Sequence, residues 1–222
     1  MPVSTNTCKS GDFVDETLFE QIACAIEERG YVVLPASLPE TVADNLLDGL
    51  SRLSEQRFHR AKVGRGSDQV RNRFVRNDRI AWIEDDDDDL AAWLLWTRQL
   101  KDYLNRRLFL GLFGFESHFA HYLPGDFYKK HLDAFRGEAN RVLSLVTYLN
   151  KGWEPHQGGE LLMYSPEDER ELFKVQPCFG TLVLFLSEEF PHEVLPAERD
   201  RYSVAGWFRL NTSLNNQIDP AR

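Results

Sequence analysis

The spacing of apolar residues changes from helical to strand-like about halfway along the chain. In the first half, apolar positions recur every three to four residues, as with Leu18, Ile22 and Ile26. This spacing predicts helices, with short strands between them. From residue 116 onward, apolar and polar residues alternate in short segments bounded by glycine, proline and acidic turn residues, which predicts strands. The expected helices are 15–30, 37–53 and 85–112, and the expected strands are 31–35, 79–84, 116–123, 127–133, 141–149, 159–165, 171–177, 180–187, 192–197 and 200–210.

Eight short strands in succession, without helices between them, indicate a sandwich, a jelly roll or a barrel. We therefore expect one α+β domain with a double-stranded β-helix (jelly roll) core and the N-terminal helices packed on one of its sheets. In this prediction residues 1–11 form a flexible tail and residues 12–222 form the domain. Helical support occupies 12–115 and the β-helix core occupies 116–212.

Residues 57–79 interrupt the pattern with a strongly basic run. They hold eight Lys or Arg against two Asp, and two glycines lie inside the run. This composition predicts an exposed, mobile loop. The loop is either a solvated segment without a partner or a docking surface that steers an acidic partner.

Composition excludes several classes of protein. The 222 residues are 42% hydrophobic and 27% charged, so a core of ordinary size is expected. The net charge of -9 disfavours a general nucleic-acid binder, and no apolar run is long enough to span a membrane. The N-terminus lacks a signal-peptide pattern, and the three cysteines show no C-x-x-C spacing. These features predict a cytoplasmic protein with free thiols.

The sequence His131-Leu132-Asp133 is the first candidate for chemistry. Two positions apart in a strand face the same side, so an imidazole and a carboxylate would converge. A facial site of two histidines and one carboxylate needs a further histidine from a distant strand. His156 lies in a Gly/Pro-rich connection, whereas His192 opens a predicted strand and is the better third ligand.

Arg201 is a further candidate site residue, beside the proposed ligand His192. If segments 192–197 and 200–210 pair as a hairpin, Arg201 lies on the strand next to His192. The small residues Ser203 and Ala205 share its face and leave room for a slim ligand. A guanidinium at the end of such a slot suits bidentate binding of a carboxylate, to which the hydroxyl of Tyr148 could add a hydrogen bond.

At this point the chain resembles a known family. The order of "YLPGDFYKKHLD", "TYLNKGW", "GGELLMY" and "PHEVLPAERDR" is similar to that in iron(II)- and 2-oxoglutarate-dependent dioxygenases. Within that family it most resembles the prolyl hydroxylases that act as oxygen sensors in animals, and their bacterial relatives. The resemblance covers roughly residues 70–210.

The resemblance implies a set of site residues. His131, Asp133 and His192 would bind Fe(II), and Arg201 with Tyr148 would bind 2-oxoglutarate. Ala205 stands where the animal enzymes have a threonine, which leaves cosubstrate affinity open. The remaining implied residues are Tyr122, Leu161 and Trp207 for the cosubstrate, with Tyr128 and the 57–79 loop on the substrate side.

The resemblance also implies an activity. O2 and 2-oxoglutarate would be consumed, succinate and CO2 released, and C4 of a proline in a protein hydroxylated. Elongation factor Tu is the substrate implied by the bacterial relatives, and neither nucleic acid nor membrane is expected as a partner. Two alternatives stay open: a dioxygenase of the same chemistry that acts on a free amino acid or another side chain, and a non-catalytic jelly roll that binds a structural metal such as zinc.

Overall fold

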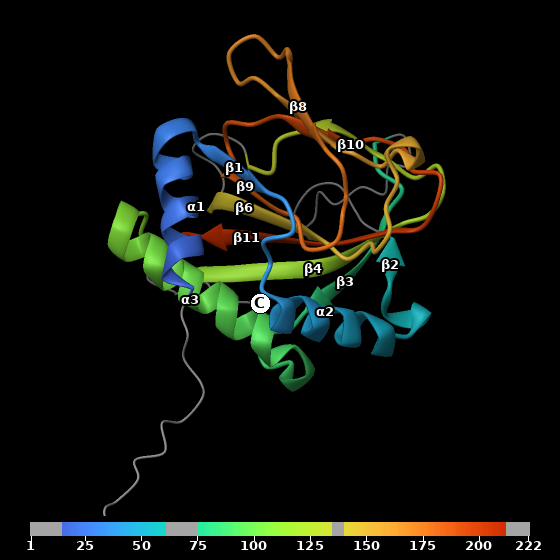
Figure 1. Ribbon diagram of the computed structural model, residues 1–222, viewed down its shortest axis with the longest axis horizontal. Helices are drawn as coiled ribbons and strands as arrows, with labels where there is room; N and C mark the ends of the chain where they lie inside the picture. The colour runs from blue at the N-terminus through green and yellow to red at the C-terminus, as the bar shows by residue number, and fades with distance from the viewer. Residues whose placement is uncertain (1–14, 61–74, 135–139, 212–222) are drawn as a thin grey trace, which may run out of the picture.

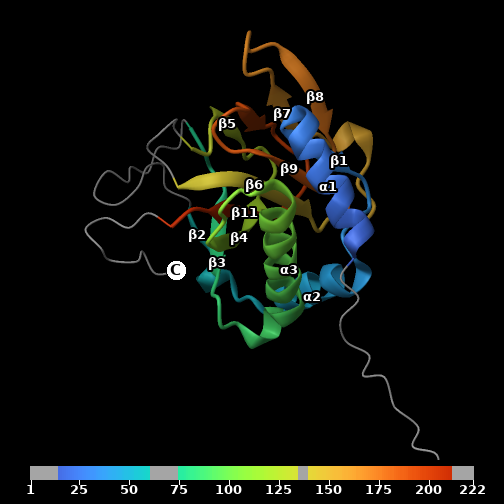
Figure 2. The same cartoon turned by 90° about the vertical axis from the view of Figure 1, so that its left-hand side faces the viewer.

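The computed structural model describes residues 15–60, 75–134 and 140–211. Two antiparallel β-sheets face each other, and three α-helices cover the outer side of the larger sheet (Figures 1 and 2). The helices are α1 (Glu16–Arg29), α2 (Glu40–Arg52) and α3 (Ala91–Leu108), with 3-10 turns η1 (Glu55–Arg57), η3 (Asp88–Leu90) and η4 (Pro155–Gln157). None of the described helices is both long and apolar enough to cross a membrane.

The strands divide between a seven-stranded and a four-stranded sheet. The larger sheet has the order β1-β9-β6-β11-β4-β3-β2, and the smaller has the order β5-β10-β7-β8. The strands are β1 (Tyr31–Leu34), β2 (His59–Arg60), β3 (Arg79–Ile83), β4 (Gly114–Tyr122), β5 (Tyr128–His131), β6 (Arg141–Tyr148), β7 (Leu161–Tyr164), β8 (Glu171–Val175), β9 (Leu182–Leu186), β10 (His192–Val194) and β11 (Arg201–Arg209). Each of the eight segments predicted as strands from residue 116 onward overlaps one of these, so the α+β double-stranded β-helix is confirmed.

Strands from the first half of the chain also join the larger sheet. Strand β1 pairs with β9, and β3 pairs with β4. The prediction that 57–79 is entirely a loop is wrong at its ends, because His59 and Arg60 pair with Ile80 and Arg79. The backbone there gains cross-strand hydrogen bonds, which a basic composition does not prevent. Residues 61–74 lie outside the described residues.

The central strands of the larger sheet are buried on both faces, and this fixes where a site can form. Its outer face packs against the helices through side chains such as Phe119 and Leu145. Its inner face packs against the smaller sheet through alternating side chains such as Ala120, Tyr148 and Phe185. Side chains that alternate along a strand point to opposite faces, so polar residues on the inner face are enclosed between the two sheets.

The chain turns sharply at Gly30, between the end of α1 and the start of β1. The Asp15 carboxylate accepts a hydrogen bond from the backbone N–H of Leu18 (3.1 Å), which caps the start of α1. At the other end, Gly30 adopts a left-handed conformation with φ of 78°, and its N–H donates to the carbonyl of Ile26. The turn sends the chain directly into β1, beside β9.

Candidate metal centre

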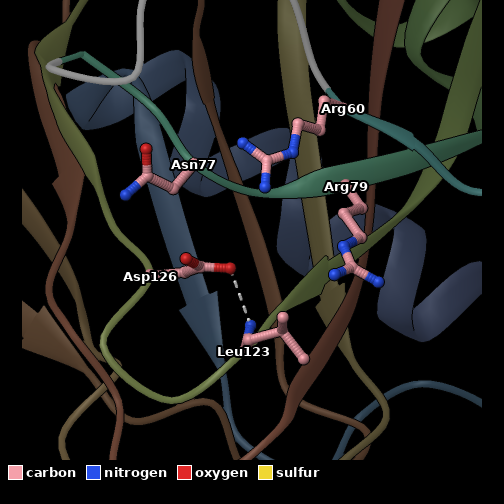
Figure 3. A pocket seen from close by; sticks show the side chains of 5 residues that line it. All are labelled: Arg60, Asn77, Arg79, Leu123 and Asp126. Atoms are coloured by element: carbon pink, nitrogen blue, oxygen red, sulfur yellow. Dashed lines mark hydrogen bonds between the residues drawn. The ribbon is translucent and has the colours of Figure 1, made fainter.

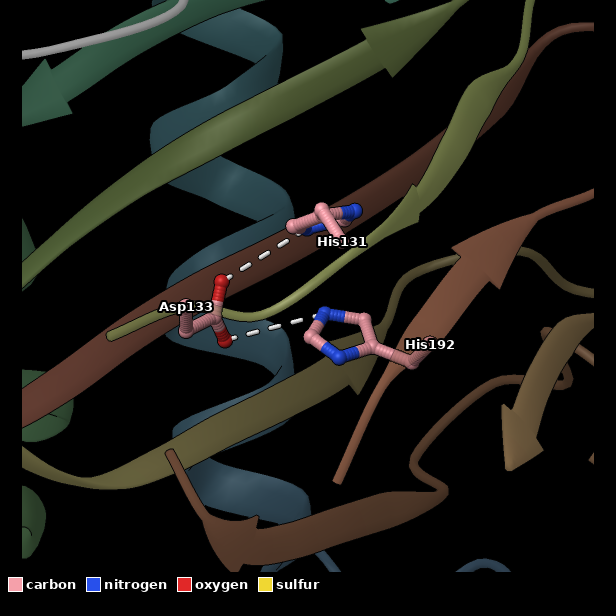
Figure 4. Close-up of side chains that lie close together, drawn as sticks. All are labelled: His131, Asp133 and His192. Carbon is pink, nitrogen blue, oxygen red and sulfur yellow. Dashed lines mark ion pairs between the residues drawn. The ribbon is translucent and has the colours of Figure 1, made fainter. Parts of the chain in front are cut away.

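Two histidines and one aspartate lie close together beside the β5–β10 pair of the smaller sheet. His131 ends β5, and His192 begins β10 directly opposite it in the antiparallel ladder. Asp133 lies in a bend just after β5, so it is not in the strand as predicted, yet its carboxylate still turns toward both rings (Figure 4). One ligand atom from each residue lies within 4.8 Å of the other two. The structure therefore brings these three side chains together, and their binding of a metal stays a prediction.

Backbone carbonyls orient both imidazoles. Nδ1 of His131 lies 2.8 Å from the carbonyl oxygen of Lys129, and Nδ1 of His192 lies 3.0 Å from that of Phe190. A carbonyl oxygen only accepts, so each Nδ1 carries a proton and each Nε2 presents a lone pair. The two Nε2 atoms lie 3.6 Å and 3.7 Å from the oxygens of Asp133. Such carbonyl partners are typical of histidines that bind metals.

The carboxylate of Asp133 is also held in place. Its Oδ2 accepts a hydrogen bond from the Ser144 hydroxyl at 2.6 Å, and that hydroxyl lies 2.9 Å from the hydroxyl of Ser187. Both serines are buried. Sequence reasoning missed their role, although Ser144 is a polar residue within the apolar stretch of β6 and thus a visible signal.

The charges of the cluster suit a cation. Burial alone would raise the pKa of Asp133, but the imidazoles of His192 and His131 hold it well below its usual range. Burial and the neighbouring His131 lower the pKa of His192 to about 4. A carboxylate and neutral imidazoles are the protonation states that bind a divalent metal.

Arg201 lies across the interior from this cluster, in the other sheet. The predicted hairpin between 192–197 and 200–210 is wrong, because β10 pairs with β5 and β7 whereas Arg201 opposes Tyr122 on β4. Although β10 and β11 are close along the chain, each pairs with strands that are distant in sequence, and the two belong to different sheets. Arg201 is 1% exposed, and its guanidinium donates from Nε to the Gly159 carbonyl (2.8 Å) and from Nη1 to the Ser203 hydroxyl (3.2 Å).

The positive charge of Arg201 is not balanced by a carboxylate in the described part of the chain. Among the described residues, no carboxylate pairs with this buried guanidinium, which lies 4.9 Å and 5.1 Å from the ring centroids of Tyr122 and Tyr148. The Tyr148 hydroxyl is buried without a hydrogen-bond partner in the described part of the chain. Burial raises the pKa of Tyr148 to about 12, so the hydroxyl remains a donor. Leu161 belongs to the same buried cluster as the two tyrosines. An unpaired cation beside an unpaired donor fits a carboxylate ligand.

Known proteins share this sequence and architecture. The family model of the 2OG-Fe(II) oxygenase superfamily matches residues 117–209. A prolyl-4-hydroxylase of Pseudomonas putida is 38% identical in its crystal structure, with a TM-score of 0.77 over 87% of this chain and 100% of that chain. The chain belongs to the 2OG-Fe(II) oxygenase superfamily. Fe(II), 2-oxoglutarate and O2 are accordingly its metal and cosubstrates.

More distant relatives of this oxygenase include animal proteins. A prolyl hydroxylase of Trichoplax adhaerens, solved with a hypoxia inducible factor oxygen degradation domain peptide fragment, is 26% identical, with a TM-score of 0.76 over 90% of this chain and 94% of that chain. Human prolyl hydroxylase EGLN3 is 26% identical over 88% of this chain and 84% of its own length.

The donor set of the oxygenase fits an iron site. Two imidazole nitrogens and one carboxylate oxygen could together hold Fe(II), and a set of three protein donors would leave other positions on the ion for a cosubstrate and O2. A closed structural zinc site uses four protein ligands, and the cluster found among the described residues has three. His156 lies in η4 and does not take part in that cluster.

Two aromatic residues expected near the site lie on its metal side. The ring of Tyr128 stacks on that of His131, with centroids 3.5 Å apart. Trp207 pairs with Ser144, the residue whose hydroxyl donates to Asp133. Along β11, Trp207 lies six residues after Arg201. Its ring lies against the guanidinium of Arg141 at 3.6 Å. That Trp207 lines the cosubstrate pocket stays a prediction.

Proposed function

We propose that this oxygenase hydroxylates C4 of a prolyl residue in a protein substrate. The observation that carries the proposal is the His131, Asp133 and His192 cluster with the unpaired Arg201 across the interior. The proposal also draws on the similarity to the prolyl-4-hydroxylase of Pseudomonas putida over all of that chain. Residues 12–222 would act as one domain around this site.

Each side chain has a role in the proposal. The Nε2 atoms of His131 and His192 and the carboxylate of Asp133 would bind Fe(II). The Arg201 guanidinium and the Tyr148 hydroxyl would bind the distal carboxylate of 2-oxoglutarate. Tyr122, Leu161 and Trp207 would enclose the cosubstrate, whereas Tyr128 and the 57–79 segment would face the substrate.

The cofactors supply the oxidation, which couples decarboxylation of 2-oxoglutarate to succinate with transfer of one oxygen atom to the substrate. The chain provides orientation and exclusion of water. Ser144 fixes the carboxylate of Asp133, and Tyr128 covers one face of the His131 ring. The buried Arg201 aligns the cosubstrate before reaction, so little reorganisation is needed when it binds.

The class of substrate is supported by a relative. The Trichoplax enzyme was solved with a peptide fragment of a protein, which supports a protein substrate here. Elongation factor Tu is our candidate, on the basis of the motifs shared with bacterial prolyl hydroxylases. A cytoplasmic location is part of the same proposal, supported by the free thiols of Cys24 and Cys178.

The test is oxidation of three substrates by the iron-loaded enzyme. Elongation factor Tu, prolyl peptides and free proline would each be incubated with 2-oxoglutarate in air and analysed by mass spectrometry. We expect a proline in the protein to gain one oxygen atom, with succinate formed in equal amount. Oxidation of free proline while prolyl peptides stay inert would contradict the proposal in favour of an amino-acid oxygenase. Zn(II) bound in a site insensitive to 2-oxoglutarate would contradict an enzymatic role.

A further inference from the structure

The segment immediately before β3 lies alongside β5, the strand that ends at a proposed metal ligand. The backbone N–H of Asn77 donates to the carbonyl of Phe127 (3.2 Å), and the N–H of Lys129 donates to the carbonyl of Val75 (2.8 Å). Asn77 also lines a small hollow together with Asp126, which belongs to the turn before β5 (Figure 3). A segment continuous with the larger sheet is thereby joined to a strand of the smaller one.

Within this contact, the side chain of Arg76 lies over the ring of Tyr128. The guanidinium carbon is 4.2 Å from the centroid of the ring, and the two residues oppose each other in an antiparallel bridge. A guanidinium so close to a tyrosine is attracted to the negative face of the ring. The backbone and the side chain of Arg76 therefore both contact Tyr128.

Asp78 fixes the plane of this guanidinium. Nε and Nη2 of Arg76 donate to the two carboxylate oxygens of Asp78, at 2.7 Å and 2.5 Å. The side chain of Asp78 is fully buried and that of Arg76 is 12% exposed, so water competes little with the pair. A paired contact of this kind orients both planar groups, which a single hydrogen bond would not do.

The ring of Tyr128 lies between Arg76 and His131. The Tyr128 and His131 rings are stacked, with centroids 3.5 Å apart and planes inclined by 12°. Two planar groups this close to one ring cannot share a face of it, because their atoms would overlap. The guanidinium, the phenol ring and the imidazole therefore follow one another in a stack that begins at the buried Asp78 carboxylate.

The same segment restrains His131 in a second way. Nδ1 of His131 donates to the carbonyl of Lys129, and the N–H of Lys129 is bound to Val75. The stack sets the plane of the imidazole, and this hydrogen bond sets which nitrogen points away from the backbone. Such restraint matters here because β5 is four residues long and lies at the edge of the smaller sheet.

We propose that Arg76 is a positioning residue for the metal centre. Anchored by Asp78, it holds the ring of Tyr128 against that of His131, so that Nε2 of the imidazole already points toward the metal before the metal binds. This inference rests on the proposed function, because it takes His131 as a metal ligand. A ligand that is oriented in advance loses less side-chain entropy on binding, and partners that orient ligands typically contribute 10–100-fold to metal affinity.

The experiment measures binding of Mn(II) to the full chain by electron paramagnetic resonance, without 2-oxoglutarate and without substrate. Any contact between Tyr128 and a substrate is therefore absent from the result. The variants are Tyr128→Leu, Tyr128→Phe, Arg76→Lys and the double variant Arg76→Met/Asp78→Leu, which leaves no unpaired buried charge. Arg29→Met is the control, because Arg29 lies over Tyr31 on β1, at the opposite edge of the larger sheet. Circular dichroism and thermal unfolding establish that each variant is folded.

We expect Tyr128→Leu and the double variant to raise the Kd for Mn(II) by about tenfold or more, because both end the stack on the imidazole. Tyr128→Phe keeps an aromatic ring between the guanidinium and His131, so its Kd should stay within about twofold of the wild type. Arg29→Met should also keep the wild-type Kd. Loss of a merely structural contact would lower the melting temperature and leave the Kd of the folded protein unchanged.

Arg76→Lys decides the role of the arginine even if the double variant does not fold. A lysine keeps a positive charge beside the Asp78 carboxylate but lacks the planar fork, so the Kd for Mn(II) should rise severalfold in the folded variant. An unchanged Kd in Arg76→Lys and in any folded double variant, or in Tyr128→Leu, would overturn this inference alone. An equal loss in Tyr128→Phe and Tyr128→Leu would assign the effect to the hydroxyl and overturn it as well. A wild-type protein that binds no Mn(II) would instead contradict the proposed function.

Discussion

Replacing Tyr148 by phenylalanine should have opposite effects on stability and on cosubstrate binding. The Tyr148 side chain is fully buried, and its hydroxyl has no hydrogen-bond partner among the described residues. A buried unpaired donor costs free energy, and a carboxylate ligand that accepts its hydrogen bond would remove that cost.

The magnitudes follow from the burial of the hydroxyl. An unsatisfied buried polar group costs about 1–3 kcal/mol, and the small void left by one oxygen atom offsets part of the gain when it is removed. We expect Tyr148→Phe to raise the free energy of unfolding of the ligand-free protein by about 1 kcal/mol, or the melting temperature by about 2–4 °C. Loss of a hydrogen bond to a carboxylate should weaken 2-oxoglutarate binding by about 1.5 kcal/mol or more, which is at least roughly tenfold in Kd.

Urea unfolding of the metal-free protein measures the first effect, and calorimetric titration of 2-oxoglutarate with Mn(II) in place of Fe(II) measures the second without turnover. Tyr164→Phe is the control, because the Tyr164 hydroxyl already has Glu193 as its partner. The control should lose stability and keep its affinity for 2-oxoglutarate. A Tyr148→Phe protein that is less stable than the wild type and binds 2-oxoglutarate normally would refute the reasoning.

Three further substitutions test other parts of the account. Arg201→Lys should raise the Kd for 2-oxoglutarate by about tenfold or more in the same calorimetric assay, because an ammonium cannot make the paired contacts of a guanidinium; an unchanged Kd would exclude it from the site. Ser144→Ala removes the donor to the metal-site carboxylate and should lower Mn(II) affinity by about 10–100-fold in an equilibrium titration, whereas a structural serine would leave it unaltered. Gly206→Ala should lower the free energy of unfolding by about 1–3 kcal/mol in urea, since its Cβ would lie 2.4 Å from the Phe115 ring; Gly114→Ala, which meets no atom within 4 Å, is the matched control, and equal stability of the two variants would contradict the packing argument.

The strands were predictable because their signal is local. Alternation over a few residues, closed by glycine and proline, identified the eight strands after residue 116 without knowledge of their partners. Pairing is not local, so the sequence did not show that β1 lies beside β9 or that β10 and β11 belong to different sheets. The incorrect hairpin at 192–210 came from treating closeness along the chain as closeness in the sheet.

The proximity of His131, Asp133 and His192 was predictable for a related reason. His131 and Asp133 are separated by one residue, and His192 was the better candidate because it opened a strand. Ser144 and Ser187 act through contacts between strands that are distant in sequence, and no spacing rule connects them with Asp133. Likewise, the sequence did not predict β2, which lies within a run of basic residues. Charged side chains indicate that a segment is exposed to solvent, but they do not show whether its backbone pairs with another strand.

The most direct test is a crystal of the protein grown with Mn(II) and 2-oxoglutarate, with the metal located by anomalous scattering. The account predicts one peak within bonding distance of the Nε2 atoms of His131 and His192 and of a carboxylate oxygen of Asp133. It also predicts the distal carboxylate of 2-oxoglutarate against Arg201 and the hydroxyl of Tyr148. A peak bound elsewhere, or a cosubstrate carboxylate turned away from Arg201, would contradict it.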